Sequence, residues 1–194
     1  MAPVIYSVGH SNLAAEDFFA LLTGAGVGIL ADVRAFPASR RHPHFAREAL
    51  NCAATERGLA YEWMPALGGR RHGGSAESRH VAWEVPAFRN YADYADTVPF
   101  AAALGELEKL ARTAPTAFMC AEALWWQCHR RLIADRLLIA SWDVRHLAAH
   151  GRLPPHRLPE FARVVDGRVV YDRGTTARLP LADASAATRS RHRR

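Results

Sequence analysis

The stretch TAFMCAEALWWQCHRRLIADRLL (residues 116–138) decides the fold class of this chain. It opens with a short apolar run, passes through polar residues and continues with apolar residues at helical spacing. A second apolar run, DVRHLA (143–148), follows closely. We therefore predict a strand over TAFMCAE, a helix over LWWQCHRRLIADRLL and another strand over DVRHLA. A strand, a helix and a strand in this order form the unit from which parallel sheets are built.

The preceding residues repeat this alternation. Short β-branched and apolar runs predict three further strands, over residues 4–10, 28–34 and 60–65. Apolar spacing predicts helices over SNLAAEDFFALLTGAG, AREALNCAATERG, FRNYADYAD (88–96) and residues 98–112. The glycine-rich segment LGGRRHGGSAESRH (67–80) predicts a loop. We expect an α/β fold with a mostly parallel sheet and helices on both faces, in three layers, plus a C-terminal β-hairpin.

The composition divides the chain into three segments. Residues 1–150 hold the alternating pattern and form the expected α/β domain. Residues 151–181 form an extension in which Asp166-Gly167, between two apolar runs, predicts a two-residue hairpin turn. Residues 182–194 are small, polar and basic, which predicts a disordered tail.

Charge and cysteine content indicate the environment of the protein. The net charge is +6, and 24 of the 25 basic residues are arginine. The three cysteines are odd in number and too few for a secreted disulfide framework. No signal-peptide pattern and no apolar run of membrane-spanning length occurs. We expect a cytoplasmic protein with no membrane partner, and the basic balance leaves a nucleic-acid partner possible.

Polar side chains follow several of the predicted strands. Because parallel strands place their carboxyl ends at one edge of the sheet, ligands bind in crevices beyond that edge. We expect residues from distant parts of the chain to meet there. The candidates that follow strands are His10, Ser11, Asn12, Asp32, Arg34, Cys120, Glu122 and His146.

Some of these candidates have structural alternatives. Ser11 or Asn12 could cap the first helix, whose N-terminal N–H groups could instead hold a phosphate or carboxylate. Asp32 needs a partner if it is buried, and a structural pair with Arg34 competes with a catalytic role. His10 has no capping role to explain it.

Two arginine clusters lie on predicted loops at the same edge of the sheet. Arg40 and Arg41 follow the second strand, and Arg70 and Arg71 follow the third. Planar guanidinium groups suit phosphates and carboxylates through paired hydrogen bonds, although solvated surface arginines are the competing interpretation. We expect an anionic ligand.

The segment from Cys120 to Arg130 allows several kinds of site. Zinc would need four ligands, whereas Cys120, Cys128 and His129 supply three, with seven residues between the thiols. An oxyanion-binding thiol loop would need an arginine where Trp126 stands. In a third interpretation, Glu122 is a general acid or base, and His129 and Arg130 bind the substrate. Cys120 is then a packed thiol.

The segments SVGHSN, ADVRAFPASRRHPHF, LGGRR, FRNYADY and MCAEALWWQCHRRLIAD resemble, in this order, motifs of the domain of unknown function 488 family. The resemblance covers about residues 4–148. It implies a small cytoplasmic bacterial or archaeal protein, without naming a reaction. The family's recurrent polar positions correspond to His10, Ser11, Asn12, Asp32, Arg34, Arg40, Arg41, Cys120, Glu122, Cys128, His129 and Arg130.

The leading hypothesis is a hydrolase or group-transfer enzyme that acts on an anionic, phosphate- or nucleotide-containing ligand. Glu122 or Asp32 would be the acid/base group, assisted by His10 and His129. The expected ligand-binding residues are Ser11, Asn12, Arg34, Arg40, Arg41, Arg70, Arg71 and Arg130. Hydrolysis or group transfer is favoured because no dinucleotide glycine fingerprint or Walker loop occurs. We expect no cofactor, and with only three candidate zinc ligands we expect no metal.

Two alternatives remain open from the sequence. A nucleic-acid-binding protein could stack bases on Trp125 and Trp126 and grip the backbone with its basic tail. A redox or metal protein could use Cys120 and Cys128, since nearby arginines lower thiol pKa values.

Overall fold

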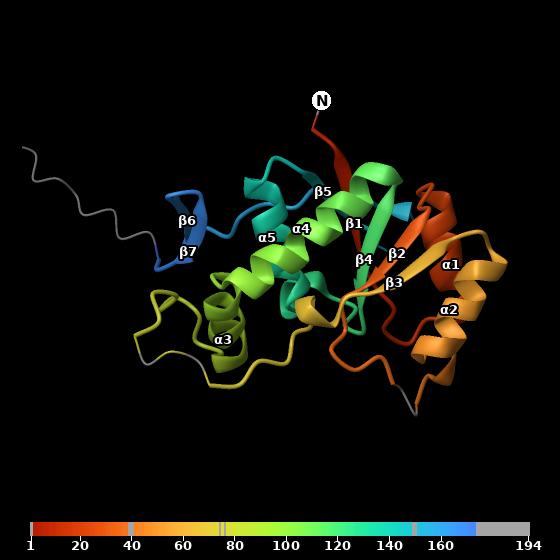
Figure 1. The fold of residues 1–194 in the computed structure, drawn as a ribbon, viewed down its shortest axis with the longest axis horizontal. Helices are drawn as coiled ribbons and strands as arrows, with labels where there is room; N and C mark the ends of the chain where they lie inside the picture. Colours follow the sequence, from red (N-terminus) through yellow and green to blue (C-terminus); the bar gives the residue numbers. More distant parts are fainter. Residues whose placement is uncertain (1, 39–40, 74, 76, 149–150, 174–194) are drawn as a thin grey trace, which may run out of the picture.

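A five-stranded parallel sheet forms the centre of the protein (Figure 1). The computed structural model describes residues 2–38, 41–73, 75, 77–148 and 151–173. The strand order is β3-β2-β4-β1-β5. Their bounds are β1 Val4–Gly9, β2 Ile29–Asp32, β3 Ala60–Trp63, β4 Thr116–Cys120 and β5 Asp143–His146. All four strand pairings are parallel, as the alternating sequence pattern predicts.

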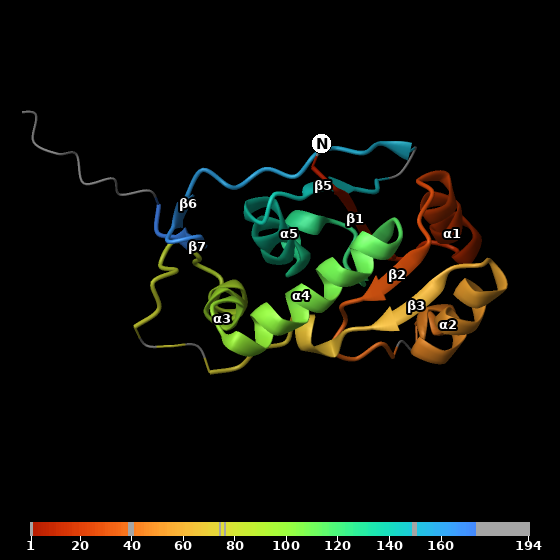
Figure 2. The same cartoon turned by 45° about the horizontal axis from the view of Figure 1, so that its top comes forward.

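Helices cover both faces of the sheet, which confirms the three-layer prediction (Figure 2). The helices are α1 Ala15–Gly24, α2 Arg47–Glu56, α3 Pro86–Ala95, α4 Val98–Thr113 and α5 Arg130–Ile139. On one face, α1 and α2 pack with Val8, Leu30 and Met119. On the other face, α3, α4 and α5 pack with Ile5 and Phe118. Alternate strand residues thus enter two separate apolar clusters, as the two-residue period of a strand requires.

The neighbouring strands β1 and β4 lead into helices on opposite faces. The two strands pair as far as Gly9 and Cys120. The chain then turns to α1 on one side and towards α5 on the other. The β1–β5 ladder ends earlier, at Ser7 and His146. The carboxyl edge of the sheet is therefore open beside β1, where parallel sheets bind ligands.

Two expectations about helix starts are wrong. The last helix begins at Arg130 instead of Leu124, because Trp125–Gln127 forms a separate 3₁₀ turn and Cys128 is extended. The first helix begins at Ala15, with no side-chain cap at Ala14. Ser11 and Asn12 are therefore not caps, and the GHSN segment is not a helix N-terminus. The backbone N–H groups of His10 and Ser11 donate instead to the carbonyls of Cys120, at the end of β4, and Ala121, just after it.

The C-terminal hairpin is confirmed, as β6 Ala162–Val165 and β7 Arg168–Tyr171. Asp166 and Gly167 have φ values of 48° and 70°, the left-handed conformation that a two-residue hairpin turn requires. Val169 and Tyr171 are fully buried in the same cluster as α3 and α5.

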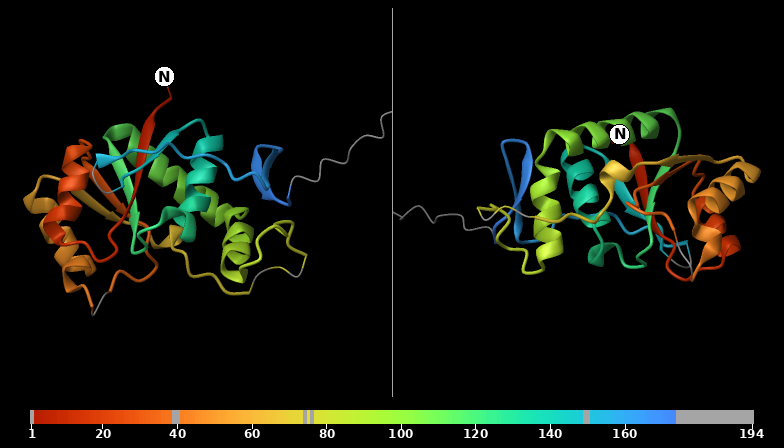
Figure 3. Two further views of the ribbon diagram at one scale, coloured as in Figure 1. Left: turned by 180° about the vertical axis from the view of Figure 1, so that it is seen from behind. Right: turned by 60° about the horizontal axis from the view of Figure 1, so that its bottom comes forward.

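Between β5 and the hairpin the chain runs back across the molecule (Figure 3). Pro155 on this path bridges to Arg145. The predicted tail, residues 182–194, lies outside the described residues. Within the described part of the chain, no helix has the length and apolar character needed to cross a membrane.

Candidate functional site

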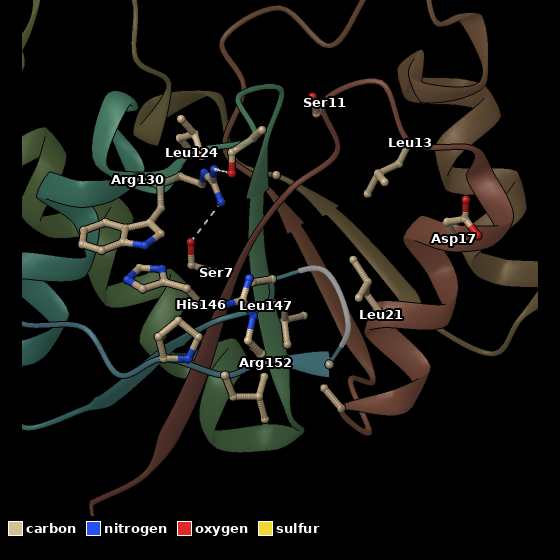
Figure 4. Close-up of a pocket in the computed structure, with 18 of the residues that line it drawn as sticks. Ser7, Ser11, Leu13, Asp17, Leu21, Leu124, Arg130, His146, Leu147 and Arg152 are labelled. Atoms are coloured by element: carbon tan, nitrogen blue, oxygen red, sulfur yellow. Dashed lines mark hydrogen bonds between the residues drawn. The ribbon is translucent and has the colours of Figure 1, made fainter.

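A cavity of about 1180 Å³ opens where β1 and β5 separate at the carboxyl edge (Figure 4). Its polar wall comes from β1, the loop after β4, the first turn of α5 and the end of β5. The opposite wall comes largely from α1 and the residues before it, and it is mostly apolar, with Leu13 and Leu21, apart from Asp17. The polar lining residues used below are Ser7, Ser11, Asn12, Trp125, Arg130 and His146. The cavity is the size of a mononucleotide pocket or larger.

Arg130 places a buried positive charge in the polar wall. The residue is 1% exposed, and its Nη1 donates to Ser7 Oγ at 3.1 Å while Nη2 donates to the Glu122 carbonyl. Its Nε has no hydrogen-bond partner. Among the described residues, no carboxylate forms an ion pair with this guanidinium. Burying a guanidinium without a carboxylate partner is costly.

Gly9 makes this position of Arg130 possible. A Cβ atom at Gly9 would lie 1.8 Å from the Glu122 carbonyl oxygen and 2.7 Å from Arg130 Nη2. Only a residue without a side chain fits at this point, because real Cβ atoms do not approach so closely. The end of β1 is thus shaped around the guanidinium.

A hydrogen-bonded chain of buried groups leads to His146 in the same wall. Asp135 accepts a hydrogen bond from the Tyr171 hydroxyl at 2.6 Å, and its other oxygen lies 2.8 Å from His156 Nε2. His156 Nδ1 lies 3.1 Å from His146 Nε2. All four groups are buried.

The chain fixes the proton positions on both rings. Because a carboxylate accepts, His156 Nε2 carries the proton, and its Nδ1 accepts from His146 Nε2. His146 Nδ1 is then a bare nitrogen, and it has no hydrogen-bond partner. Burial is the main cause that lowers the pKa of His146 from 6.5 to about 3, and the nearby charge of Arg130 acts in the same direction. His146 is therefore neutral at physiological pH, with a free lone pair.

Aromatic and apolar side chains frame the cavity. The Trp125 ring stacks on His146 with a centroid distance of 4.0 Å and an interplanar angle of 1°. Trp126 and Leu124 also line the cavity and are 46% and 40% exposed. An exposed indole beside a buried guanidinium suits a ligand with both a planar and an anionic part.

The second cluster of predicted residues lies at the end of β2 and is closed on itself. Asp32 and Arg34 form a bidentate ion pair, with Nε–Oδ1 at 2.8 Å and Nη2–Oδ2 at 2.5 Å. Asp32 also accepts from the Arg34 backbone N–H and from the Tyr61 hydroxyl. Arg34 Nη1 donates to the Phe45 carbonyl. Asp32 is fully buried, and both of its carboxylate oxygens already accept hydrogen bonds. The pair therefore has the geometry of a structural ion pair.

His10 belongs to this closed cluster. Its ring stacks on Phe45 at 4.0 Å, and Nε2 lies 3.3 Å from Arg34 Nη1. Burial, followed by the charge of Arg34, lowers the pKa of His10 to about 4. His10 is therefore a neutral, packed histidine, while the neighbouring Ser11 and Asn12 line the cavity.

A third cluster joins the end of β4 to the start of α5. Cys120 and Cys128 are 2% and 4% exposed, and their Sγ atoms lie 2.7 Å apart as free thiols. His129 Nδ1 lies 3.4 Å from Cys128 Sγ, and His129 Nε2 contacts the Val33 carbonyl at 3.0 Å. The donor atoms of these three residues lie within 4.8 Å of one another. The seven residues between the thiols therefore do not separate them in space.

The remaining predicted residues do not converge with these clusters. The Glu122 side chain is exposed, and its backbone carbonyl is the part that contacts Arg130. Arg41 and Arg70 are exposed, and Arg70 lies over the Phe36 ring. Arg71 donates to the Ala66 carbonyl. Arg40 lies outside the described residues.

Three functional candidates were missed by sequence reasoning, namely Ser7, Asp135 and His156. Asp135 interrupts the apolar face of a helix, which is a signal that it needs a buried partner. Ser7 is the first residue of the SVGHSN segment but lies within an apolar strand, and His156 lies in the extension, where no motif marks it. Their role follows only from the contacts.

The fold and the cavity define a class: a parallel-sheet α/β protein with a cavity at the carboxyl edge. The family model "Domain of unknown function DUF488" matches residues 14–137, so the chain belongs to that family, as the sequence motifs predicted. Neither the curated proteins nor the solved structures contain a match to this chain.

Proposed function

We propose that this protein is an enzyme that acts on an anionic small molecule, bound in the cavity between β1 and β5. The observation that carries the proposal is the buried guanidinium of Arg130, which lines the cavity without a carboxylate partner among the described residues. A phosphate or carboxylate would supply the missing charge through charge-assisted hydrogen bonds. The Ser7 and Ser11 hydroxyls are the neighbouring polar groups of the wall.

A nucleotide fits the cavity better than a bare anion. The volume of about 1180 Å³ far exceeds a phosphate group. The exposed Trp126 ring offers a flat surface to a base or another planar group. The ligand would place its phosphate at Arg130 and its planar part against the aromatic rim.

His146 is the acid/base group that the proposal assigns in place of Asp32 and Glu122. Its Nδ1 is a buried nitrogen without a hydrogen-bond partner, and it would take a proton from a hydroxyl or water nucleophile bound against it, which suits hydrolysis or group transfer. The His156–Asp135 pair would stabilise the resulting imidazolium, as a carboxylate does for a catalytic histidine. A bound anion also raises the pKa of His146, because it offsets the charge of Arg130.

A thermal-shift experiment tests the binding step. The wild-type chain is heated with inorganic phosphate, AMP, adenosine and short oligonucleotides at low and moderate salt. We expect AMP to raise Tm more than adenosine, and the rise to persist in moderate salt. At a ligand concentration about 100 times Kd, the expected stabilisation is about 2.7 kcal/mol.

Two arginine variants make the test specific. Arg130→Lys keeps the charge and loses the planar fork, so the AMP shift should fall strongly. Arg168→Met removes an exposed arginine of the hairpin and should leave the shift unchanged. Equal shifts with AMP and adenosine would contradict the proposal. Stabilisation by oligonucleotides alone, fading with salt, would favour the nucleic-acid alternative instead.

A cytoplasmic location forms part of the proposal, because nucleotides and phosphorylated metabolites are found there and two of the three cysteines are held as a close pair of free thiols.

A further inference from the structure

Cys120 and Cys128 form a pair of thiols that lies outside the cavity lining, on the other side of the Arg130 backbone contact. We infer that this pair is a peroxide-oxidised dithiol, which closes reversibly to a Cys120–Cys128 disulfide. The Sγ atoms lie 2.7 Å apart, well inside the normal contact distance of two sulfurs. The inference does not depend on the identity of the cavity ligand.

The surroundings prepare Cys128 to react first. The backbone N–H of Arg130 donates to its sulfur at 3.5 Å, and the guanidinium of Arg130 adds positive charge nearby. Burial by itself would raise the pKa of Cys128. The hydrogen bond to Cys120 and the two contributions of Arg130 outweigh burial and lower this pKa from 9.0 to about 7. Burial raises the pKa of Cys120. One thiolate and one thiol side by side is the arrangement of an attacking and a resolving cysteine.

His129 is placed to accept the proton from Cys128. Its Nε2–H donates to the Val33 carbonyl, which leaves Nδ1 as the acceptor facing Cys128 Sγ at 3.4 Å. Gly69 packs directly on this nitrogen, since a Cβ there would lie 2.5 Å from Nδ1. The ring is thereby held against the thiol.

The oxidation balances with hydrogen peroxide as the oxidant. The Cys128 thiolate attacks one peroxide oxygen, the O–O bond breaks, and the departing hydroxide takes a proton to leave as water. Cys120 then attacks the sulfenic sulfur of Cys128 and releases its own proton. The S–O bond breaks, a second water leaves and the S–S bond forms. The protein loses two electrons and the peroxide is reduced to water; an external dithiol reverses the reaction by exchange.

The geometry favours a disulfide over a metal site at the same residues. Two thiolates on one zinc ion lie about 3.8 Å apart, because each Zn–S bond is about 2.3 Å long in a tetrahedral site. The observed separation is 2.7 Å, and the Gly69 backbone occupies the space beside His129 Nδ1. Both cysteines are almost fully buried, which excludes large oxidants and favours a small one.

Peptide mass analysis tests the inference on the wild-type chain. The reduced protein receives one equivalent of hydrogen peroxide, free thiols are alkylated in acid, and trypsin then cuts after arginine. One tryptic peptide, residues 113–130, contains both Cys120 and Cys128, while the exposed Cys52 lies in residues 48–57. We expect peptide 113–130 to lose the mass of two hydrogen atoms, without alkylation, and dithiothreitol to restore both alkylation sites.

Variants and contrary results complete the test. Cys52→Ser should behave as the wild type, whereas Cys120→Ser should leave Cys128 carrying oxygen or a single alkyl group. The inference is overturned if both cysteines of peptide 113–130 remain alkylated after peroxide, or if they gain oxygen without closing. Blocked cysteines that are released by a chelator would show a metal site and overturn it as well. These mass measurements are made without AMP, so their outcome is distinct from that of the binding experiment.

Discussion

Two regions of the carboxyl edge hold the same kinds of residue in opposite states. At the end of β2, Arg34 meets Asp32 in a buried ion pair beside the neutral His10. At the end of β1, Arg130 lies beside the neutral His146 without a carboxylate partner among the described residues. The first region is complete in itself, and the second has an unbalanced charge and a bare ring nitrogen. Residue type alone therefore does not distinguish a structural cluster from a binding site. The difference is whether the arginine has a carboxylate partner within the protein.

The largest effect is expected from Asp32→Asn, which removes the charge that distinguishes the β2 cluster from the Arg130 region. The amide keeps the shape of the side chain but leaves the Arg34 guanidinium buried without its counter-charge. We expect a loss of about 3–5 kcal/mol in the free energy of unfolding, measured by urea denaturation. AMP binding by the folded fraction should not change.

Asp143→Asn is the matched control for this experiment. Asp143 pairs with Arg145 on the surface, so its removal should shift the urea midpoint only slightly. Equal losses from the two variants would mean that the β2 cluster is no more structural than a surface pair.

Gly9→Ala should damage the second region selectively. The added methyl would collide with the Glu122 carbonyl and with Arg130. We expect a loss of about 1–3 kcal/mol from overpacking, together with weaker AMP binding by the protein that still folds. Gly105→Ala in α4 is the control, because nothing lies within 4 Å of a Cβ there and Gly105 does not line the cavity, and it should be neutral or slightly stabilising. An unchanged AMP affinity in Gly9→Ala would show that AMP binding does not depend on the position of Arg130.

The pH dependence of stability should reflect both neutral histidines. The pKa values of His10 and His146 in the folded state are about 4 and about 3, below the 6.5 of the unfolded chain. The unfolded state therefore binds more protons as the pH falls below 6.5, and stability is lost. Each histidine should contribute a slope of about 1.2 kcal/mol per pH unit between pH 6 and pH 5.

Urea denaturation of the wild type, His10→Gln and His146→Gln at pH 7, 6 and 5 measures these slopes. Each variant should flatten the slope by the contribution of one histidine. A variant with the wild-type slope would show that its histidine is already protonated, or exposed, in the folded protein.

The smallest expected effect belongs to the rim of the cavity. Trp126→Ala removes an exposed ring and should change the unfolding free energy by less than about 0.5 kcal/mol. AMP binding should weaken by about 1 kcal/mol, as the loss of one base-stacking contact predicts, while phosphate binding stays the same. Calorimetric titration with both ligands checks this. Equal losses of binding free energy for AMP and phosphate would mean that the base of AMP does not stack on Trp126.

Much of the fold could be predicted from the sequence. The alternation of short apolar runs with helical spacing gave the five strands and five helices, and Asp166-Gly167 gave the hairpin. The start of α5 was missed because apolar spacing continues back to Leu124, whereas the Trp125 ring stacks on His146. That contact depends on β5 and cannot be seen in a local pattern.

The candidate site was predictable only in part. Ser11 and Cys120, which the sequence analysis placed at strand ends, lie at the carboxyl edge, and the segment leading into α5 adds Cys128 and Arg130 there. The sequence could not separate Arg34 from Arg130, because their difference lies in one carboxylate partner. The Asp135–His156–His146 chain joins a helix, the C-terminal extension and β5, so no spacing rule connects its members.

A crystal soak with tungstate tests the central claim most directly. Tungstate resembles phosphate in shape and charge, and its anomalous scattering locates it without ambiguity. The unpaired guanidinium predicts an anomalous peak in the β1–β5 cavity, with oxygens at about 3 Å from Arg130, and no peak at Arg34. A cavity without a peak at saturating tungstate, or a peak at Arg34 instead, would contradict the assignment of Arg130 as the anion-binding residue.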